Sequence, residues 1–225
     1  MNKILVVSAH PDDEILGCGA TLAKRILEGD KVFLLILGEG ITARYSNRFE
    51  ADRGELSNLK NSLDNVSKTL GVEKYWQFGY PDNRFDSIDL LDIVKSVELI
   101  KKEISPNIIY THFCNDLNID HRITFSATLT ACRPFGNESV KEMYSFESFS
   151  STEWVYNSKH VFTPNVMVNV ENTIEKKLEM LKLYDEIKDY PHPRSIEAIR
   201  VSAQKHGISV GCKYAEAFEL VRMIK

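Results

Sequence analysis

The chain has 225 residues, which at roughly 150 residues per domain fits one domain or two and is long enough to bury a full core. Hydrophobic residues make up 43% of the chain and charged residues 27%. This average globular usage excludes a disordered tail, a collagen, a coiled coil and a disulfide-stapled mini-protein. The 28 basic and 32 acidic residues give a net charge of −4, and neither half is strongly basic. We therefore expect no nucleic-acid partner, and a small molecule instead.

No stretch of the sequence is typical of a membrane span or a secretory leader. The longest apolar runs, such as residues 32–37, have the length of a strand, whereas a span needs about 20 apolar residues. The apolar run after Lys3 is also too short for the core of a signal peptide. The four cysteines lie far apart and form no C-x-x-C pair. These features predict a cytoplasmic protein with reduced thiols.

Over the first 132 residues, short strand-like apolar runs alternate with longer helical stretches. The expected strands are residues 3–9, 31–37, 72–78 and 107–112. The expected helices are residues 15–28, 49–70, 87–103 and 119–132. Gly71 has the usual position of a glycine after a helix, and Pro106 closes the third helix. This alternation predicts an α/β fold with a mostly parallel sheet and helices on both of its faces.

The rhythm changes after Pro134. The expected elements there are strands at residues 142–148, 166–170 and 215–223 and helices at residues 172–188 and 195–205. The first of these helices opens with a capping box at residues 172–175. No repeat and no long linker divides the sequence. We therefore expect one domain over residues 1–225, with an elaborated C-terminal third.

Two clusters of histidine and aspartate follow two of the predicted strands. The run A-H-P-D-D-E at residues 9–14 lies between the first strand and the first helix. The fourth strand ends at His112, and the run N-D-L-N-I-D-H at residues 115–121 follows it. Ligands of open α/β sheets bind beyond the carboxyl ends of the strands, where the strand order reverses, and the first and fourth strands normally border that point. We therefore expect the two clusters to face each other across one crevice.

These residue types suit a metal centre. Catalytic zinc takes three protein ligands from His, Asp and Glu and keeps a fourth position for water. The first cluster offers His10 and two consecutive aspartates, Asp12 and Asp13. Because consecutive residues cannot easily both bind one ion, one aspartate would bind it and the other would face the water as a general base. His121 would be the third ligand.

Each cluster also has a structural alternative. The first could be a turn with an aspartate that caps the next helix, and the second could be an ordinary helix N-terminus. The Gly17-Cys18-Gly19 run partly fits a dinucleotide fingerprint as well. Its third glycine position is Leu22, however, and the carboxylates before the turn would repel a pyrophosphate. We therefore expect no NAD site.

Further motifs occur in a recognisable order over almost the whole chain. They include Leu70-Gly71-Val72, Pro81-Asp82-Asn83 and Tyr214-Ala215-Glu216-Ala217-Phe218. Together with the two clusters, they make the chain resemble the PIG-L/LmbE family of zinc-dependent N-deacetylases. The resemblance implies a Rossmann-like fold and Zn²⁺ as the cofactor, with other divalent transition metals able to substitute. It also implies an N-acetylated amino sugar as the substrate, either small or nucleotide-linked, for the assembly of glycans or glycoconjugates.

The resemblance also implies roles for individual residues. The implied metal ligands are His10, Asp13 and His121. Asp12 would be the general base, and Asp120 would support a ligand. Many family members have a histidine where this chain has Asn118, a histidine that could protonate or polarise the reacting amide. Its replacement gives more of the proton transfer to Asp12.

Five other residues could touch the substrate or a metal ligand: Arg44, Arg84, His112, His192 and Arg194. Arg44 and Arg84 lie in loops that could reach the crevice. His192 and Arg194 could face an anionic substrate such as a nucleotide diphosphate, or could belong to an ordinary helix start. His112 could assist the oxyanion, orient a ligand, or be structural.

The predicted reaction is metal-dependent hydrolysis of an acetamide, which releases acetate and a free amine. Two alternatives stay open: a non-catalytic sugar- or nucleotide-binding module of the same fold, and a zinc hydrolase of another amide or ester. Asp12 beside three ligands argues against the binding module, because binding needs no base. A homo-oligomer is compatible with the sequence, which does not predict the number of subunits.

Overall fold

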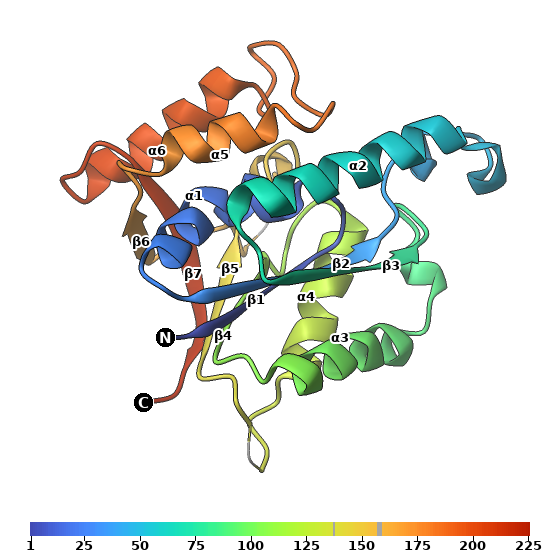
Figure 1. Cartoon of the computed structure of the whole chain (residues 1–225), viewed down its shortest axis with the longest axis horizontal. Helices are drawn as coiled ribbons and strands as arrows, with labels where there is room; N and C mark the ends of the chain where they lie inside the picture. Colours follow the sequence, from blue (N-terminus) through green and yellow to red (C-terminus); the bar gives the residue numbers. More distant parts are fainter. Residues whose placement is uncertain (137, 157–158) are drawn as a thin grey trace.

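Seven strands form one sheet in the computed structural model, which describes residues 1–136, 138–156 and 159–225 (Figure 1). The strands are β1 (Lys3–Ser8), β2 (Lys31–Gly38), β3 (Lys74–Tyr80), β4 (Ile108–His112), β5 (Glu142–Phe146), β6 (Val166–Asn169) and β7 (Ala215–Met223). Their order across the sheet is β3-β2-β1-β4-β5-β7-β6. Strands β1 to β5 pair in parallel, and β7 runs antiparallel to both of its neighbours. The mostly parallel α/β fold predicted from the sequence is confirmed.

Helices cover both faces of this sheet. They are α1 (Asp13–Leu27), α2 (Arg53–Leu70), α3 (Leu90–Ile104), α4 (Ile119–Ala131), α5 (Ile174–Leu181) and α6 (Ile196–Ser209). Figure 1 shows α1, α2, α5 and α6 on one face and α3 and α4 on the other. Alternate residues of β1 reach opposite layers, since Ile4 packs in the first hydrophobic cluster and Leu5 in the second. Burial on both faces explains why residues 4–7 of β1 are all apolar.

Several boundaries differ from the sequence prediction by a few residues. Helix α2 begins at Arg53 rather than at residue 49, because Asp52 accepts the backbone N–H of Glu55 at 3.0 Å and caps the helix. Residue 49 lies in a separate short 3-10 helix, Arg48–Glu50. The predicted start of α3 at residue 87 is also wrong, because the chain forms another 3-10 turn there. Strand β3 is shifted toward the C-terminus.

The largest difference lies in α5, which ends at Leu181 rather than near residue 188. The predicted capping box is also wrong, because Thr173 is the N-cap and its side chain makes no capping hydrogen bond. After Leu181 the chain turns, and Tyr184 becomes buried with its hydroxyl 2.6 Å from Glu14 Oε1. The helix therefore ends before the residue that makes this long-range contact, and apolar periodicity cannot predict such a contact.

The centre of the sheet positions the two clusters. Strands β1 and β4 are neighbours there, and the strand order reverses between them, so the loops that follow them open at the same edge. Helix α1 begins beside this edge and packs very closely on the sheet. A Cβ atom on Gly17 would lie 2.2 Å from the ring of Phe146. Only glycine fits this close approach.

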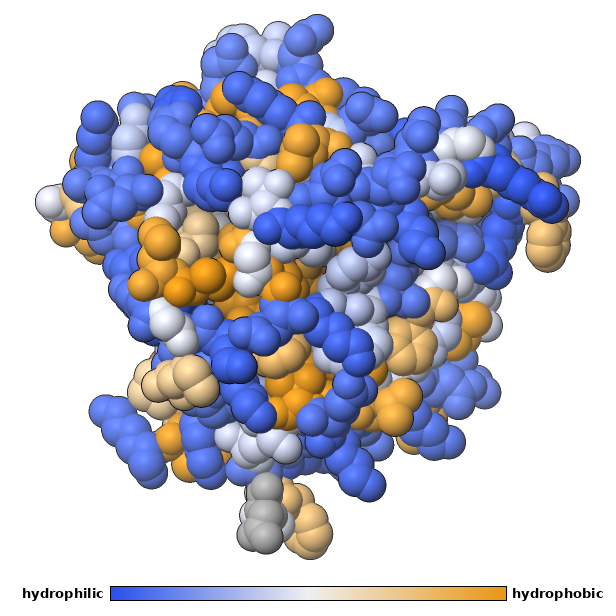
Figure 2. All heavy atoms as spheres, in the orientation of Figure 1, coloured by the Kyte–Doolittle hydropathy of each residue, from blue (hydrophilic) through white to orange (hydrophobic). Residues whose placement is uncertain are grey.

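The described residues include no helix long and apolar enough to cross a membrane. On the face drawn in Figure 2, hydrophilic side chains dominate, and hydrophobic atoms show mainly where the edge of the sheet lies between the helix layers. The four cysteines are unpaired thiols, and two of them, Cys18 and Cys132, are buried.

Candidate metal and active site

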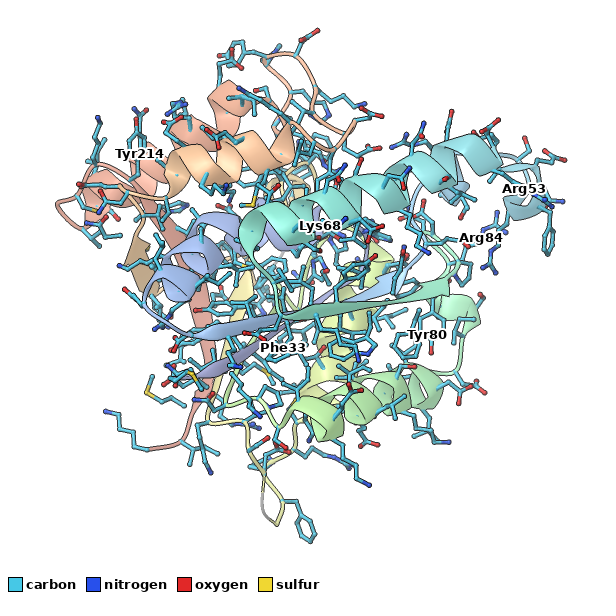
Figure 3. All side chains as sticks on the ribbon, in the orientation of Figure 1. Phe33, Arg53, Lys68, Tyr80, Arg84 and Tyr214 are labelled. Carbon is cyan, nitrogen blue, oxygen red and sulfur yellow. The ribbon has the colours of Figure 1, made fainter. Side chains whose placement is uncertain are left out.

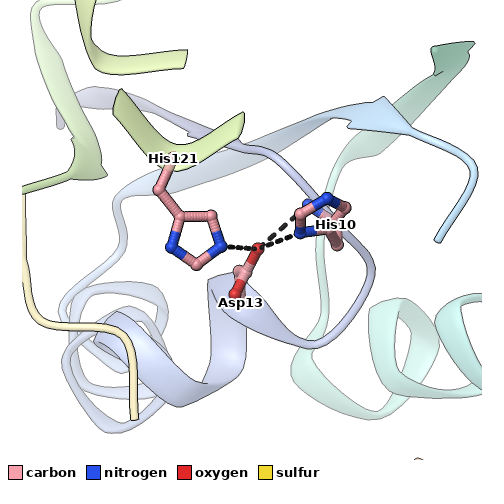
Figure 4. A group of neighbouring side chains, drawn as sticks. All are labelled: His10, Asp13 and His121. Carbon is pink, nitrogen blue, oxygen red and sulfur yellow. Dashed lines mark hydrogen bonds and ion pairs between the residues drawn. The ribbon is translucent and has the colours of Figure 1, made fainter. Parts of the chain in front are cut away.

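The loops after β1 and β4 bring the two clusters together. His10 lies in the loop between β1 and α1, Asp13 is the first residue of α1, and His121 lies in the first turn of α4. One ligand atom from each residue lies within 4.8 Å of the other two, and the three side chains point toward one centre (Figure 4). Asp13 Oδ2 is 3.3 Å from His10 Nδ1 and 3.4 Å from His121 Nε2. This geometry fits a metal centre with three protein ligands.

Two further carboxylates set the tautomers of the histidines. Asp120 Oδ2 lies 2.9 Å from His10 Nε2, and Asp116 Oδ1 lies 2.9 Å from His121 Nδ1. Because a carboxylate accepts, each histidine donates its proton to the outer carboxylate. In the neutral form of each ring, which is the form that binds a metal, the lone pairs of His10 Nδ1 and His121 Nε2 then face Asp13. Carboxylate–histidine pairs of this kind orient the ligands of metal sites.

Unpartnered atoms at the centre fit a bound cation. Asp13 Oδ1 and His121 Nε2 are buried and have no hydrogen-bond partner among the described residues. Buried polar atoms are nearly always partnered, so a cation would complete both of them.

The pKa shifts of Asp13 and His121 also fit a bound cation at this centre. Burial by itself would raise the pKa of Asp13, but His121 brings that pKa well below its usual value. Burial by itself would lower the pKa of His121, but Asp13 and Asp116 raise it to about 9. The carboxylates therefore favour positive charge at this point. A donor set of two imidazoles and one carboxylate suits Zn²⁺.

Asp12 lies beside His10, Asp13 and His121, which together are called the metal group below, and it lines a neighbouring cavity. Its backbone has a φ of 106°, which non-glycine residues rarely adopt, and such strain is common at functional sites. This turn directs Asp12 and the next residue, Asp13, to different places. Arg194 Nη1 donates to Asp12 Oδ2 at 2.8 Å, and Glu14 Oε2 accepts the backbone N–H of Asp12 at 3.0 Å. Burial raises the pKa of Asp12 to about 7, and Arg194 opposes that rise.

His112 is buried beneath the metal group with both ring nitrogens engaged. Its Nε2 accepts the backbone N–H of Ala9 at 2.9 Å, so its Nδ1 carries the proton and donates to Ser148 Oγ at 2.9 Å. Burial lowers the pKa of His112 to about 3 and keeps the ring neutral. The ring stacks on His121 with the centroids 4.0 Å apart. This packing against His121 fits an orienting or structural role for His112, since neither of its nitrogens is free for an oxyanion.

A cavity of about 350 Å³ opens next to the metal group. Its lining includes His10, Asp12, Arg44, Asn118 and Arg194. Asn118 Oδ1 also accepts the backbone N–H of Asp120 at 2.9 Å and so caps α4. This volume lies at the lower end of the ~300–1,000 Å³ found for small-molecule sites.

Two of the proposed substrate residues lie outside this lining. Arg84 is exposed at the right-hand edge of the view in Figure 3. His192 packs edge-on against Trp154, and its Nδ1 accepts the backbone N–H of Arg194 at 3.1 Å. His192 thus supports the segment that carries Arg194, whose Nε donates to Ser150 Oγ at 2.8 Å.

Sequence reasoning missed the supporting carboxylates Asp82 and Asp116. Asp116 accepts from His121 and from the hydroxyls of Ser151 and Thr152. Asp82 Oδ1 lies 3.1 Å from His10 Nε2, and these two residues form a second possible cation group with Asp120. Both aspartates lie within the motifs noted above. The signal was therefore present, but nothing in the sequence pairs either carboxylate with a histidine.

Comparisons with known proteins agree with these motifs. The family model described as "PIG-L: GlcNAc-PI de-N-acetylase" matches residues 5–132. The Escherichia coli (strain K12) protein named "Uncharacterized deacetylase YaiS" is 28% identical over 187 residues, which cover 80% of this chain and 88% of that protein.

Two solved structures share the fold. N,N'-diacetylchitobiose deacetylase from Pyrococcus horikoshii has a TM-score of 0.76 at 18% identity, over 98% of this chain and 84% of that chain. GalB, the 4-carboxy-2-hydroxymuconate hydratase from Pseudomonas putida KT2440, has a TM-score of 0.78 at 18% identity, over 100% and 99% of the two chains. At these identities the likeness shows the fold alone. One fold therefore hosts both a deacetylase and a hydratase.

Proposed function

This chain belongs to the PIG-L family, and we propose that it hydrolyses the acetamide group of an N-acetylated amino sugar to acetate and a free amine. One observation carries the proposal: a buried carboxylate, Asp12, faces a cavity beside a His10–Asp13–His121 metal group. A base next to a metal group is what amide hydrolysis by water requires. The family description and the names of both deacetylases support the acetamide as the target.

We propose Zn²⁺ as the cofactor, held by His10, Asp13 and His121. When bound, it would polarise the acetamide carbonyl and make a water molecule more acidic. Asp120 and Asp116 keep the two imidazoles in the tautomers that binding needs. The chain itself therefore supplies three ligands and two orienting carboxylates.

Proton transfer falls to Asp12. Its carboxylate takes a proton from the attacking water and later gives that proton to the nitrogen of the leaving amine. The water oxygen ends in acetate, and the C–N bond breaks. Arg194 holds Asp12 Oδ2 at 2.8 Å and keeps the carboxylate directed at the cavity. Asn118, which lines the same cavity, has no proton to exchange at neutral pH, so Asp12 serves as base and then as acid.

A panel of substrates tests the reaction. We would load the purified chain with Zn²⁺ and measure acetate from N-acetylglucosamine, N,N'-diacetylchitobiose and a nucleotide-linked N-acetylglucosamine. Release from at least one sugar, abolished by a chelator, is expected. The shared fold of a hydratase makes addition of water to a C=C bond the second candidate. No acetate from any of the sugars would reject the proposed function.

A further inference from the structure

A second cavity lies beside the one that His10 and Asp12 line. It measures about 190 Å³ and lies between α2 and the segment after α5. Four residues line both cavities and so form the wall between them: Ile41, Arg44, Leu59 and Glu186. An ion pair closes this wall, because Arg44 Nη2 donates to both carboxylate oxygens of Glu186.

The Arg44 side of the wall is fastened to the metal group. Ile41 has a φ of 55°, left-handed backbone that a β-branched residue rarely adopts. In the turn that follows, the N–H of Ala43 donates to Asp82 Oδ2 at 3.1 Å, and Asp82 Oδ1 lies 3.1 Å from His10. Backbone strain persists only where the surroundings enforce it. The contacts of Asp82 with Ala43 and His10 therefore fix the position of Arg44 relative to the metal group.

The Glu186 side of the wall is fastened to the loop of the general base. Tyr184, two residues before Glu186, is buried and donates to Glu14 Oε1. The other oxygen of Glu14 accepts the backbone N–H of Asp12. Both halves of the ion pair are thus held by residues that contact the reaction centre.

The pair contributes more to shape than to stability. The Arg44 side chain is 52% exposed and the Glu186 side chain 13%, and an ion pair with such an exposed partner stabilises a fold little. Its removal should therefore leave the fold intact and open the wall. Behind the wall, Asn58 and Ser62 line the second cavity and offer hydrogen bonds of the kind that sugar hydroxyls accept and donate.

We propose that the Arg44–Glu186 pair determines substrate size. It confines the substrate to a single N-acetylated sugar ring in the first cavity and closes the second cavity to a linked second ring. The identity of the ring rests on the proposed function.

Binding of one-ring and two-ring sugars tests this proposal. The probes are N-acetylglucosamine and N,N'-diacetylchitobiose, titrated by calorimetry into the zinc-loaded Asp12→Asn chain so that turnover does not interfere. Arg44→Ala and Glu186→Ala, each added to this parent, should raise the affinity ratio of two-ring to one-ring sugar about tenfold or more. The charge swap, Arg44→Glu with Glu186→Arg, should return the ratio toward that of the parent.

A matched control removes a different ion pair. Arg200 pairs with Glu175 through two hydrogen bonds, and neither residue lines either cavity. Arg200→Ala should leave the ratio unchanged. Circular dichroism checks that every variant is folded.

The proposal is overturned if the parent binds both sugars equally or binds neither. It is also overturned if neither Arg44→Ala nor Glu186→Ala raises the affinity ratio of two-ring to one-ring sugar. The test also separates it from the proposed function. The expected binding pattern without acetate release by the chain that keeps Asp12 supports the size limit and rejects the reaction. Acetate release with an unchanged affinity ratio supports the reaction and rejects the size limit.

Discussion

The proposed reaction centre is built from two regions of very different sequence character. The loops after β1 and β4 hold the metal group in short motifs, with His10, Asp12 and Asp13 almost consecutive. The segment after α5 contributes Arg194 and Glu186 to the cavity from irregular chain with no motif at all. The order of strands in the sheet fixes where each strand ends, so the positions of the loops that follow can be predicted from the sequence. An irregular segment reaches the centre only through long-range contacts.

Asp12→Asn should produce the largest effect, because it removes the proposed base, which lies in the first motif. We expect turnover to fall about 10²–10⁴-fold, the range of a positioned acid–base group, while the metal content is retained. Steady-state acetate release and metal analysis of the same preparation check both parts. Near-normal turnover in metal-replete Asp12→Asn would show that the base is misassigned.

Asp116→Asn tests the support behind the motif. Loss of the carboxylate frees Nδ1 of His121 from its fixed tautomer, and such changes typically weaken metal binding about 10–100-fold. Competition with a chromogenic chelator measures the affinity. Asp86→Asn, at an exposed aspartate, is the control and should bind as the unaltered chain does. Equal affinities for the two variants would remove Asp116 from the site.

Arg194→Met examines the motif-free region. Arg194 lowers the pKa of Asp12, against the rise that burial causes. Without the guanidinium that pKa rises further, so Asp12 stays protonated to higher pH. The acidic limb of kcat/KM should then move to higher pH, and kcat at neutral pH should fall about tenfold to a hundredfold because the carboxylate is less well held.

The control for this prediction is Arg194→Lys, which keeps the charge but loses the planar fork. It should restore the position of the acidic limb while recovering only part of kcat. A pH profile that is the same in all three proteins would mean that Arg194 does not act on Asp12.

Tyr184→Phe affects the contact that joins the two regions and should have the smallest effect. It leaves Glu14 Oε1 buried without its donor, which costs about 1–3 kcal/mol of unfolding free energy. Urea denaturation measures the change. Tyr190→Phe, at a ring that is 68% exposed, should leave stability unchanged. If both variants were equally stable, the segment after α5 would not be held by Glu14.

The same contrast explains what the sequence could predict. The order of strands and helices, the neighbouring β1 and β4, and the meeting of His10 with His121 all follow from local pattern and from the rules of parallel sheets. The predicted end of α5 was wrong because Tyr184 lies outside the helix and donates to Glu14, a residue far away in the sequence.

Two arginines show the limit most clearly. Arg44 and Arg84 were equivalent in the sequence, since both lie in loops near the crevice. Arg44 lines the cavity because Asp82 fastens the residue before it, whereas Arg84 is left exposed after the turn at Asn83. Which loop residue faces inward depends on hydrogen bonds that exist only in the folded chain.

Metal content tests most directly whether the two clusters, which lie far apart in the sequence, bind one metal ion together. The purified chain should carry about one zinc or other divalent transition metal per molecule after dialysis. The double variant His10→Ala with His121→Ala should lose most of it, as measured by plasma emission spectrometry on folded protein. Metal content unchanged in the double variant would contradict the account.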